Sequence, residues 1–404
     1  MPNATSVRHS LRGLRVVDFS QIGAGPLCGM ILGDLGADVI KIEPPEGDAG
    51  RKLGPPWYNG ESPVHIAFNR GKRAICIDLR MQEGRKIVGE LIAQADVVIE
   101  SFRPGVLGRY GFDYRSVSEN HPEIIYCSVS GFGQSGPLAD RAGVDGILQA
   151  MSGLMSLIGH AGSEPCKVQS PVVDIVTGYI ATIGVLARIA ERHETGCGAS
   201  IDVSLLTSAL ALQQHSLTSY LGDRELPAKI GSAAPYSAPN EAFEASDGWI
   251  MVAAYLGDRW QRLCNLLGVN HLADDPRFRQ SSDRVVNRAA MRTELAPAFL
   301  KRSCQAWIEL FEQNDILCAR VSDYEDVLIN PQLLHNQMVI DVDHPVKGKF
   351  QTVGCPIDST ESNTHAFRPA ASKGEHTLEI LAELGYLSSD VDRLIELGCV
   401  FSNQ

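Results

Sequence analysis

The sequence predicts an α/β fold: a doubly wound, Rossmann-like large domain and a smaller α+β domain. Three observations support this prediction. Short apolar runs alternate with segments of helical periodicity along roughly the first third of the chain, which is typical of a parallel sheet with helices on both faces. Glycine-rich turns join several of these segments. The chain has 404 residues, more than one ordinary core accommodates, so two domains are expected.

Five buried strands are expected in the first part of the chain. Each is a short apolar run bounded by turn residues, and Pro26 opens the helix that follows the first strand, where proline is favoured. The predicted strands cover residues 14–19, 37–42, 74–79, 96–100 and 124–129, and the predicted helices between them cover residues 26–35 and 83–95.

The rest of the chain predicts more helix and one linker. A loop-like stretch over residues 222–240 is rich in Pro, Gly, Ala and Ser. Residues 1–222 are therefore expected to form the N-terminal part of the large domain, residues 223–335 a small domain with its linkers, and residues 336–404 a part that returns to the large domain. The predicted helices here cover residues 145–158, 174–192, 204–221, 259–267, 284–299, 304–313 and 376–384, and strands are expected at 201–203, at 249–253 and within 339–357.

Composition excludes several classes of function. The formal net charge of −12 argues against a nucleic-acid-binding surface, which usually needs a basic stripe. The ten cysteines form no CxxC pair and no Cys/His cluster with zinc spacing, so no metal site is predicted. No apolar stretch was identified that approaches the roughly 20 residues of a membrane span. We expect a cytoplasmic protein with buried thiols and no association with a membrane.

One glycine-rich turn resembles a dinucleotide fingerprint. Residues 23–28 follow the first strand and open a helix, and they would read GxGxxG if Cys28 were glycine. Glu43 stands where a ribose-binding acid belongs. Pro26 removes a backbone N–H near the phosphate-facing helix start, and Cys28 adds a side chain where close packing calls for glycine. An NAD-dependent oxidoreductase is therefore one alternative, and a simple tight turn with a solvated Glu43 is another.

Several separated blocks together resemble the family III CoA-transferases, also called the CaiB/BaiF family. One block alone would be weak, but the set occurs in order over most of residues 12–260. The blocks cover residues 14–20, 25–26, 35–44, 69–73, 77–80, 96–105, 128–133, 135–137, 171–174, 177–178 and 195–198.

The resemblance implies a subunit of two domains, and two such ring-like subunits are expected to interlock as a homodimer. It also implies a carboxylate nucleophile at Asp174. From the residues alone, Asp174 could simply be an acid favoured at a helix start. As a nucleophile, its carboxylate would attack an acyl-CoA thioester and form a mixed anhydride, and the released CoA thiolate would then form an aspartyl-CoA thioester. An acceptor carboxylic acid would reverse these steps. The sum moves CoA between two acids, with succinyl-CoA a possible donor from family habit.

Two further alternatives follow from the same resemblance. Racemases of 2-methyl-branched acyl-CoA esters keep the Asp but use a His in an Ala-Gly-His-Asp stretch; here that place is Val144, which cannot transfer a proton. The other alternative is a non-catalytic CoA-binding protein in which Asp174 is only a helix acid. Gly23 stands where formyl-CoA-type transferases carry a Gln, so specificity for oxalate and formate is not expected.

The resemblance also implies contacts to coenzyme A, which is expected as a substrate rather than as a permanently bound cofactor. Arg109 is the foremost candidate for a phosphate contact. Four residues in segments that could approach Asp174 are candidates for acyl recognition: His160, Lys167, His215 and Tyr236. The expected CoA-binding residues are Ile77, Leu79 and Arg80 at the nucleotide end, Ser101, Phe102, Arg103 and Arg109 in the matching loop and helix, Lys72 and Arg73 on a basic face, and Ser130 and Gly131 near the pantetheine or acyl region.

Overall fold

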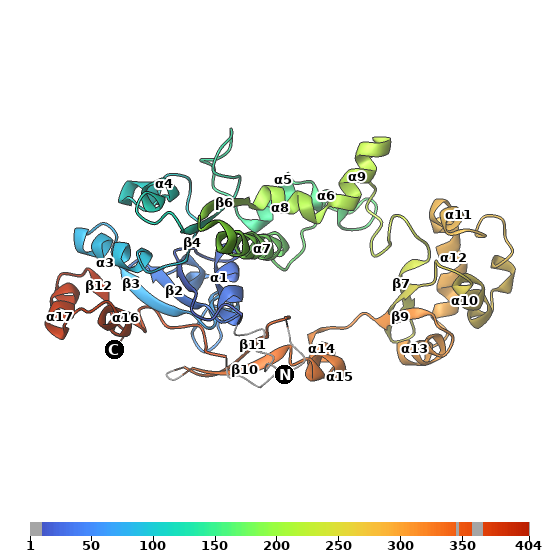
Figure 1. The fold of residues 1–404 in the computed structure, drawn as a ribbon. Helices are drawn as coiled ribbons and strands as arrows, with labels where there is room; N and C mark the ends of the chain where they lie inside the picture. The colour runs from blue at the N-terminus through green and yellow to red at the C-terminus, as the bar shows by residue number, and fades with distance from the viewer. Residues whose placement is uncertain (1–9, 345–346, 358–366, 404) are drawn as a thin grey trace. The chain divides into compact units, whose positions relative to one another are not determined.

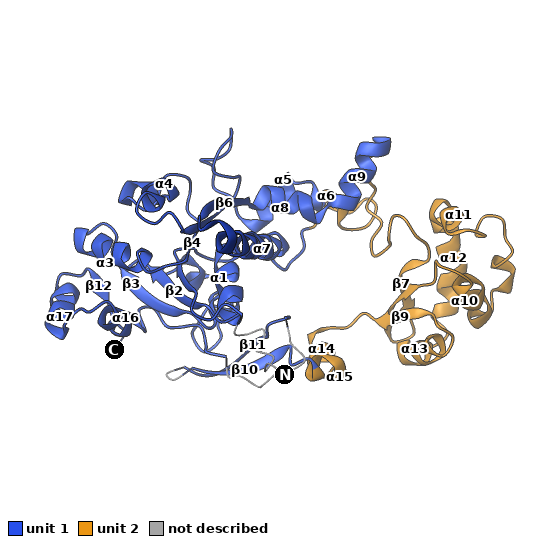
Figure 2. Ribbon diagram, in the orientation of Figure 1, with its two compact units in different colours: residues 1–155, 167–225, 336–404 blue, residues 156–166, 226–335 orange. Residues whose placement is uncertain are grey.

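The computed structural model describes residues 10–344, 347–357 and 367–403 (Figure 1). It divides into two compact units, the first made of residues 1–155, 167–225 and 336–404 and the second of residues 156–166 and 226–335 (Figure 2). The second unit is thus an insertion between parts of the first. Relative to the expected boundaries, the division falls at residue 225 instead of 222, and residues 156–166 group with the second unit.

A seven-stranded sheet organises the first unit, in the order β12-β3-β2-β1-β4-β5-β6. Six strands run parallel and β12 pairs antiparallel with β3 at one edge. The predicted parallel sheet is therefore confirmed. Since β2 and β4 flank β1 on opposite sides, the strand order reverses at the carboxyl ends of β1 and β4, where open α/β sheets bind ligands. The strands are β1 (Arg15–Asp18), β2 (Asp38–Glu43), β3 (Arg73–Ile77), β4 (Val97–Glu100), β5 (Ile125–Ser130), β6 (Ala199–Ser204) and β12 (Val400–Phe401).

Helices bury both faces of this sheet. Side chains alternate between faces along a strand, so Val16 and Val17 enter two different hydrophobic cores. Val16 packs in the core that contains residues of α1 (Ala24–Asp34) and α7 (Val172–Thr195). Val17 packs in the core that contains residues of α3 (Gln82–Ile92), α16 (Thr377–Glu383) and α17 (Ser388–Glu396). The strands are therefore near-continuous apolar runs, as expected for a sheet covered on both faces.

Several shorter elements complete the first unit. The predicted helix over 145–158 is two helices, since Gly153 between them adopts a left-handed φ of 86°. The predicted helix over 204–221 is likewise divided near Gln213. These elements are α2 (Pro63–Asn69), α4 (Tyr114–Ser118), α5 (Asp145–Met151), α6 (Leu154–Leu157), α8 (Leu205–Leu212), α9 (Gln214–Asp223), the 3₁₀ turns η2 (Ala49–Lys52) and η3 (Leu107–Tyr110), and the antiparallel hairpin β10 (Val339–His344) and β11 (Gly348–Val353).

The second unit is an α+β body with its own core. Its sheet is antiparallel in the order β7-β8-β9, and its core contains Trp260, Phe299 and Trp307. The strands are β7 (Asn240–Ala245), β8 (Gly248–Ala253) and β9 (Leu317–Arg320), and the helices are α10 (Arg259–Leu267), η4 (Asn270–Leu272), α11 (Ser281–Val286), α12 (Arg288–Phe299), α13 (Cys304–Glu312), α14 (Tyr324–Leu328) and α15 (Pro331–His335).

Helix α7 corrects one expectation from the sequence. Within the described ranges it is the one helix whose length and apolar composition would suffice to cross a membrane. In the structure it packs against α1 and against β5 and β6, and Val173, Ala181 and Val185 are fully buried. One face of α7 is therefore packed in the core of the first unit, and this packing fixes the position of the first-turn residue Asp174.

Candidate active site

A pocket lies at the carboxyl ends of β1, β4 and β5, where the strand order reverses. Its volume is about 240 Å³. Among the described residues that line it, Asp174 alone has an ionisable side chain. The lining residues are Gln21, Ile22, Gly23, Ala24, Gly25, Ser101, Phe102, Val129, Ser130, Gly131, Gly143, Val144, Asp174 and Leu205.

Asp145 holds the start of α7 and thereby the position of Asp174. Its Oδ2 accepts a hydrogen bond from the N–H of Val173 at 2.8 Å, and the N–H of Asp174 lies 3.4 Å from the same oxygen. Its Oδ1 accepts a hydrogen bond from Gln149 Nε2 at 2.6 Å. Asp145 itself is buried in the first turn of α5. One carboxylate therefore joins the N-terminal ends of two helices and satisfies donors that α7 leaves unpaired.

Asp174 occupies an environment that disfavours its charged form. Burial, followed by the negative charge of Asp145, raises the pKa of the Asp174 carboxyl to about 7. A carboxyl group with a pKa near neutrality in a pocket is typical of catalytic sites. At neutral pH the Asp174 carboxyl is therefore poised between its acid and its ionised form.

Glycines let the backbone approach the carboxylate closely. A Cβ at Gly23 would lie 2.7 Å from Asp174 Oδ2, a distance that real Cβ atoms do not show. A Cβ at Gly178 would lie 2.8 Å from the Ala24 carbonyl oxygen, so this glycine lets α7 pack directly on the start of α1. Gly131 and Gly143, which also line the pocket, approach each other in the same way.

A second pocket of about 220 Å³ adjoins the first, because Gln21 and Phe102 line both. Four of the predicted nucleotide contacts come together in it: Ile77, Leu79, Arg80 and Phe102. Arg80 is 66% exposed and its guanidinium binds Asp78 at 2.7 Å. The lining residues are Phe19, Gln21, Ile42, Pro44, Pro45, Glu46, Ile77, Asp78, Leu79, Arg80, Phe102, Val106, Leu107 and Tyr110.

Two predicted arginines lie beside this second pocket without lining it. Arg103 and Arg109 are exposed, and neither forms an ion pair with any residue that the structure describes. Arg109 belongs to η3, whose residues Leu107 and Tyr110 do line the pocket. A free guanidinium beside an apolar slot suits the phosphates of a nucleotide.

Three of the other predicted contacts to CoA line the Asp174 pocket: Ser101, Ser130 and Gly131. Ser101 Oγ accepts a hydrogen bond from the N–H of Gln21 at 2.9 Å, and Ser130 Oγ accepts one from the N–H of Gly133 at 2.9 Å. In these bonds each hydroxyl oxygen acts as an acceptor, so its O–H can still donate to another group.

The expectation that Lys72 and Arg73 form a basic face is wrong. The Lys72 ammonium is buried and lies 2.8 Å from an Asp18 carboxylate oxygen, and it also donates to the Pro26 carbonyl and to Asn69. The Arg73 guanidinium is almost buried and is bound by the carboxylates of Asp38, Glu379 and Glu383. Their acidic partners lie far away in the sequence, and they leave neither cation free for a phosphate.

The interpretation of the glycine-rich turn as a dinucleotide site is also wrong, because Glu43 is not available as a ribose-binding acid. Glu43 is fully buried, not solvated, and the Arg51 guanidinium contacts both of its carboxylate oxygens, at 2.6 and 2.8 Å. An acid held in this way does not reach a ribose. The glycine turn at residues 23–25 serves the Asp174 pocket instead.

The candidates for acyl recognition are not at the pocket wall. Lys167 and His215 belong to the same unit as Asp174, but neither lines its pocket. His160 and Tyr236 belong to the second unit. Sequence reasoning missed the role of Asp145, although this acid lies in the first turn of a predicted helix and ends the stretch that matches the racemases' Ala-Gly-His-Asp.

Comparison with known proteins agrees with this geometry. Human succinyl-CoA:glutarate CoA-transferase is 34% identical over 392 residues, covering 96% of this chain and 90% of the human protein. Acetyl-CoA:oxalate CoA-transferase of Acetobacter aceti is 35% identical over 364 residues, covering 89% and 92% of the two chains. The crystal structure of a CaiB/BaiF family protein from Brucella suis superposes with a TM-score of 0.83 at 36% identity, covering 93% of this chain and 99% of that one.

The match to the family extends over nearly the whole described fold. The sequence model of CoA-transferase family III matches residues 11–377, which include both pockets and the whole second unit. The chain therefore belongs to CoA-transferase family III.

Proposed function

We propose that the chain moves CoA between carboxylic acids through covalent intermediates on Asp174, and that its substrates are dicarboxylic acids, with succinyl-CoA as a donor. One observation supports the covalent step above all: among the described residues of the pocket wall, Asp174 alone is ionisable, and the pKa of its carboxyl is about 7. The substrate class rests on the relatives, whose names pair succinyl-CoA with glutarate and acetyl-CoA with oxalate.

The first half of the reaction loads CoA onto the enzyme. The ionised Asp174 oxygen attacks the thioester carbonyl, the carbon–sulfur bond breaks, and a mixed anhydride and a CoA thiolate result. The thiolate then attacks the aspartyl carbonyl of the anhydride and releases the donor acid as a carboxylate. CoA is now held as an aspartyl thioester. In the second half, an acceptor carboxylate reverses both steps and leaves with CoA.

The pocket offers backbone donors for the oxyanions that form in each step. Ala24 and Gly25 begin α1 and line the pocket, and the first N–H groups of a helix have no acceptor within the helix. These donors sit at the positive end of the helix dipole, beside the carboxylate that Gly23 contacts. Pro26, the next residue, has no N–H to leave unsatisfied.

The pocket argues against the racemase alternative. A two-base proton exchange needs a second proton-transfer group opposite Asp174, and the wall carries the apolar side chain of Val144 where the racemases carry histidine. We therefore do not propose racemisation.

Trapping of the intermediate tests the proposal. The protein is incubated with a panel of acyl-CoA esters, treated with hydroxylamine, digested and analysed by mass spectrometry. A hydroxamate on the peptide that carries Asp174, formed with succinyl-CoA and not with long-chain monocarboxylic esters, is the expected result. An unmodified Asp174 after incubation with every ester, in a protein that still binds CoA, excludes the covalent mechanism.

The rate should depend on the ionisation of Asp174. Since the attacking species is the carboxylate and its pKa is raised to about 7 by burial and by Asp145, kcat/KM should fall about tenfold per pH unit below pH 7 and level off above it. The measurement is initial rate against pH from 5 to 9. The Asp145→Asn variant removes one source of the shift, so its profile should move to lower pH; an unmoved profile contradicts this assignment.

Arg109 should act on CoA binding and not on chemistry. Replacing it with Gln removes a charge-assisted contact to a phosphate, and we expect KM for acyl-CoA to rise about tenfold with kcat unchanged. Arg115→Gln is the matched control, because Arg115 is an exposed arginine on the neighbouring helix α4 whose guanidinium pairs with the exposed Glu119. Equal KM values for both variants would remove Arg109 from the CoA site.

We also propose a homodimer. Large apolar side chains are exposed on four helices of the first unit: α5, α7, α8 and α9. Each of these helices contacts at least one of the others, and exposed apolar surfaces of this kind mark interfaces. Light scattering should give a mass near twice the 43.8 kDa of one chain; a monomer at micromolar concentration contradicts the proposal. The exposed residues are Ile147, Met151, Tyr179, Ile183, Leu210, Leu212, Leu217 and Leu221.

A further inference from the structure

The loop between β1 and α1 contains a strained residue. Ile22 has a φ of 72°, in the left-handed region that β-branched side chains strongly disfavour. Such a conformation persists only where the surrounding structure holds it. Ile22 lines the Asp174 pocket and immediately precedes Gly23, whose backbone lies against the Asp174 carboxylate.

Asp48 holds the backbone of this residue. Its Oδ1 accepts a hydrogen bond from the N–H of Ile22 at 3.1 Å and a second from the N–H of Gly50 at 2.7 Å. Gly50 also permits the approach, since a Cβ there would lie 3.3 Å from the Ile22 Cα and 3.1 Å from Asp48 Oδ1. The neighbouring Gln21 N–H is bound by Ser101, so the loop is fixed at two consecutive residues.

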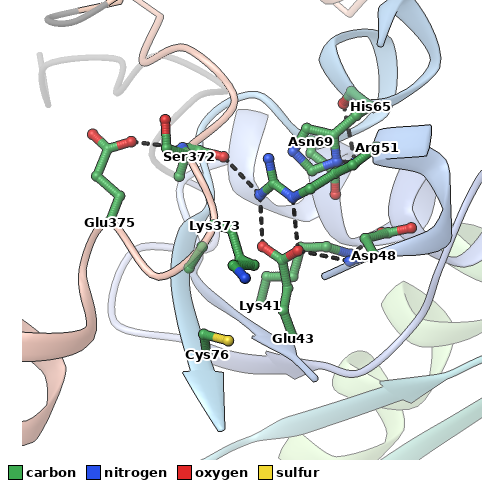
Figure 3. A network of polar contacts seen from close by, with 12 residues as sticks. Lys41, Glu43, Asp48, Arg51, His65, Asn69, Cys76, Ser372, Lys373 and Glu375 are labelled. Atoms are coloured by element: carbon green, nitrogen blue, oxygen red, sulfur yellow. Dashed lines mark hydrogen bonds and ion pairs between the residues drawn. The ribbon is translucent and has the colours of Figure 1, made fainter. Parts of the chain in front are cut away.

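Asp48 is itself part of a buried charge network (Figure 3). Its Oδ2 lies 2.7 Å from Lys41 Nζ, and both side chains are almost completely buried. Lys41 also donates to the Ser20 carbonyl at 2.8 Å, so it binds the loop as well as the acid. The N–H of Asp48 donates to Glu43 Oε2 at 2.9 Å, and Figure 3 shows that the Glu43 carboxylate also faces Arg51. Asp48 is thus held by Lys41, by Glu43 and by the N–H groups that donate to its Oδ1.

Nothing in this network reaches the reacting atoms directly, because neither Asp48 nor Lys41 lines the pocket. From the chain Lys41–Asp48–Ile22–Gly23–Asp174 we infer that Asp48 is a positioning residue, which keeps Ile22 left-handed and so places Gly23 and the start of α1 against the nucleophile. This inference rests on the proposed role of Asp174. According to this inference, the buried ion pair between Lys41 and Asp48 affects the rate of acyl transfer although it lies outside the pocket.

The test is a rescue experiment at Ile22. In Asp48→Ala the N–H of Ile22 loses its acceptor, and we expect kcat to fall about tenfold or more while KM for acyl-CoA changes less than twofold. Adding Ile22→Gly should restore kcat severalfold, because glycine adopts a left-handed φ at no steric cost. Adding Ile22→Ala should not, because alanine removes the same pocket-lining side chain but keeps the Cβ that makes this φ unfavourable.

The two double variants separate positioning from general loss of structure. A purely structural role for Asp48 predicts equal effects of glycine and alanine, or further loss with both, and that result overturns the inference. An unchanged kcat in folded Asp48→Ala, or a raised KM with kcat unchanged, also overturns it. The Ile22→Gly and Ile22→Ala single variants provide the reference rates.

A second variant answers the question if Asp48→Ala does not fold. Gly50→Ala leaves every charge in place and presses a methyl group between Asp48 and Ile22, so kcat should fall about threefold or more with KM unchanged; a wild-type kcat overturns the inference. Hydroxylamine trapping on the wild-type protein is carried out first. Absence of a label at Asp174 there defeats the proposed function, whereas a labelled wild type with unaffected loop variants defeats only the role of Asp48.

Discussion

Replacement of Asp174 by Asn or Ala should lower the kcat of CoA transfer by about 10⁴-fold or more. The variant lacks the only ionisable group of the pocket, and no lining residue of the described part of the chain replaces it. The measurement is turnover of succinyl-CoA with a dicarboxylic acceptor, followed by chromatography of the CoA esters. KM for acyl-CoA in any residual activity should stay near the wild-type value, because the second pocket, where we expect the nucleotide of CoA to bind, is untouched.

The Asp174→Asn substitution should also stabilise the folded state. The pKa of Asp174 is raised in the folded protein from 3.8 to about 7, so above pH 7 the folded state contains an unfavourable buried charge, and the cost disappears as pH falls towards 3.8. Asp174→Asn removes the charge. Its Tm should therefore exceed that of the wild type by about 2 °C or more at pH 8, and by less at pH 5.

This stability measurement is also the control for the loss of activity. An inactive Asp174→Asn with a raised Tm has lost chemistry and not structure, in line with the strain that active sites carry. A variant that keeps more than about one-hundredth of the wild-type kcat would contradict the nucleophile assignment and return Asp174 to the role of a helix-start acid.

Gly23→Ala should give the second largest loss, about 10²-fold in kcat. The new Cβ would lie 2.7 Å from Asp174 Oδ2 and 3.1 Å from its Cγ, so the carboxylate or the loop must move. A displacement of this size takes a nucleophile out of line with its carbonyl. Since Gly23 does not line the second pocket, where we expect the nucleotide of CoA to bind, KM for acyl-CoA should change little.

Gly89→Ala is the matched control for this prediction. Gly89 lies in α3, and a Cβ there meets nothing within 4 Å; because alanine favours a helix, this variant should be as active as the wild type and slightly more stable. A Gly23→Ala variant that is as active as the Gly89→Ala control would mean that the contact between Gly23 and Asp174 is not required for transfer.

Much of the large sheet could be predicted from the sequence, because strands buried on both faces are continuous apolar runs. Val16 and Val17 illustrate this: consecutive residues enter two separate cores. The short strand Val400–Phe401 and the edge strand Leu317–Arg320 were not predicted, because pairing with a partner far along the chain defines them. The break at Gly153 depends on backbone conformation that a helical pattern does not show.

The site was predictable in its residue types and less so in its geometry. The resemblance to the family indicated Asp174 and the apolar residues Ile77, Leu79 and Phe102, which do line two adjoining pockets. The sequence did not show that Lys72 pairs with Asp18 in the core, because Asp18 ends β1 and lies far from Lys72 along the chain. The cap that Asp145 forms on α7 likewise needs the packing of α5, which only the fold provides.

The position of β12 has a consequence for how the protein is made. This strand covers the edge of β3 by pairing with Cys76 and Ile77, and an uncovered edge invites pairing with other chains. On the ribosome, β3 emerges early and β12 only after the whole second unit has been synthesised. The nascent first unit must therefore wait with an open sheet edge while the inserted unit folds, and this interval is when chaperones would be most needed.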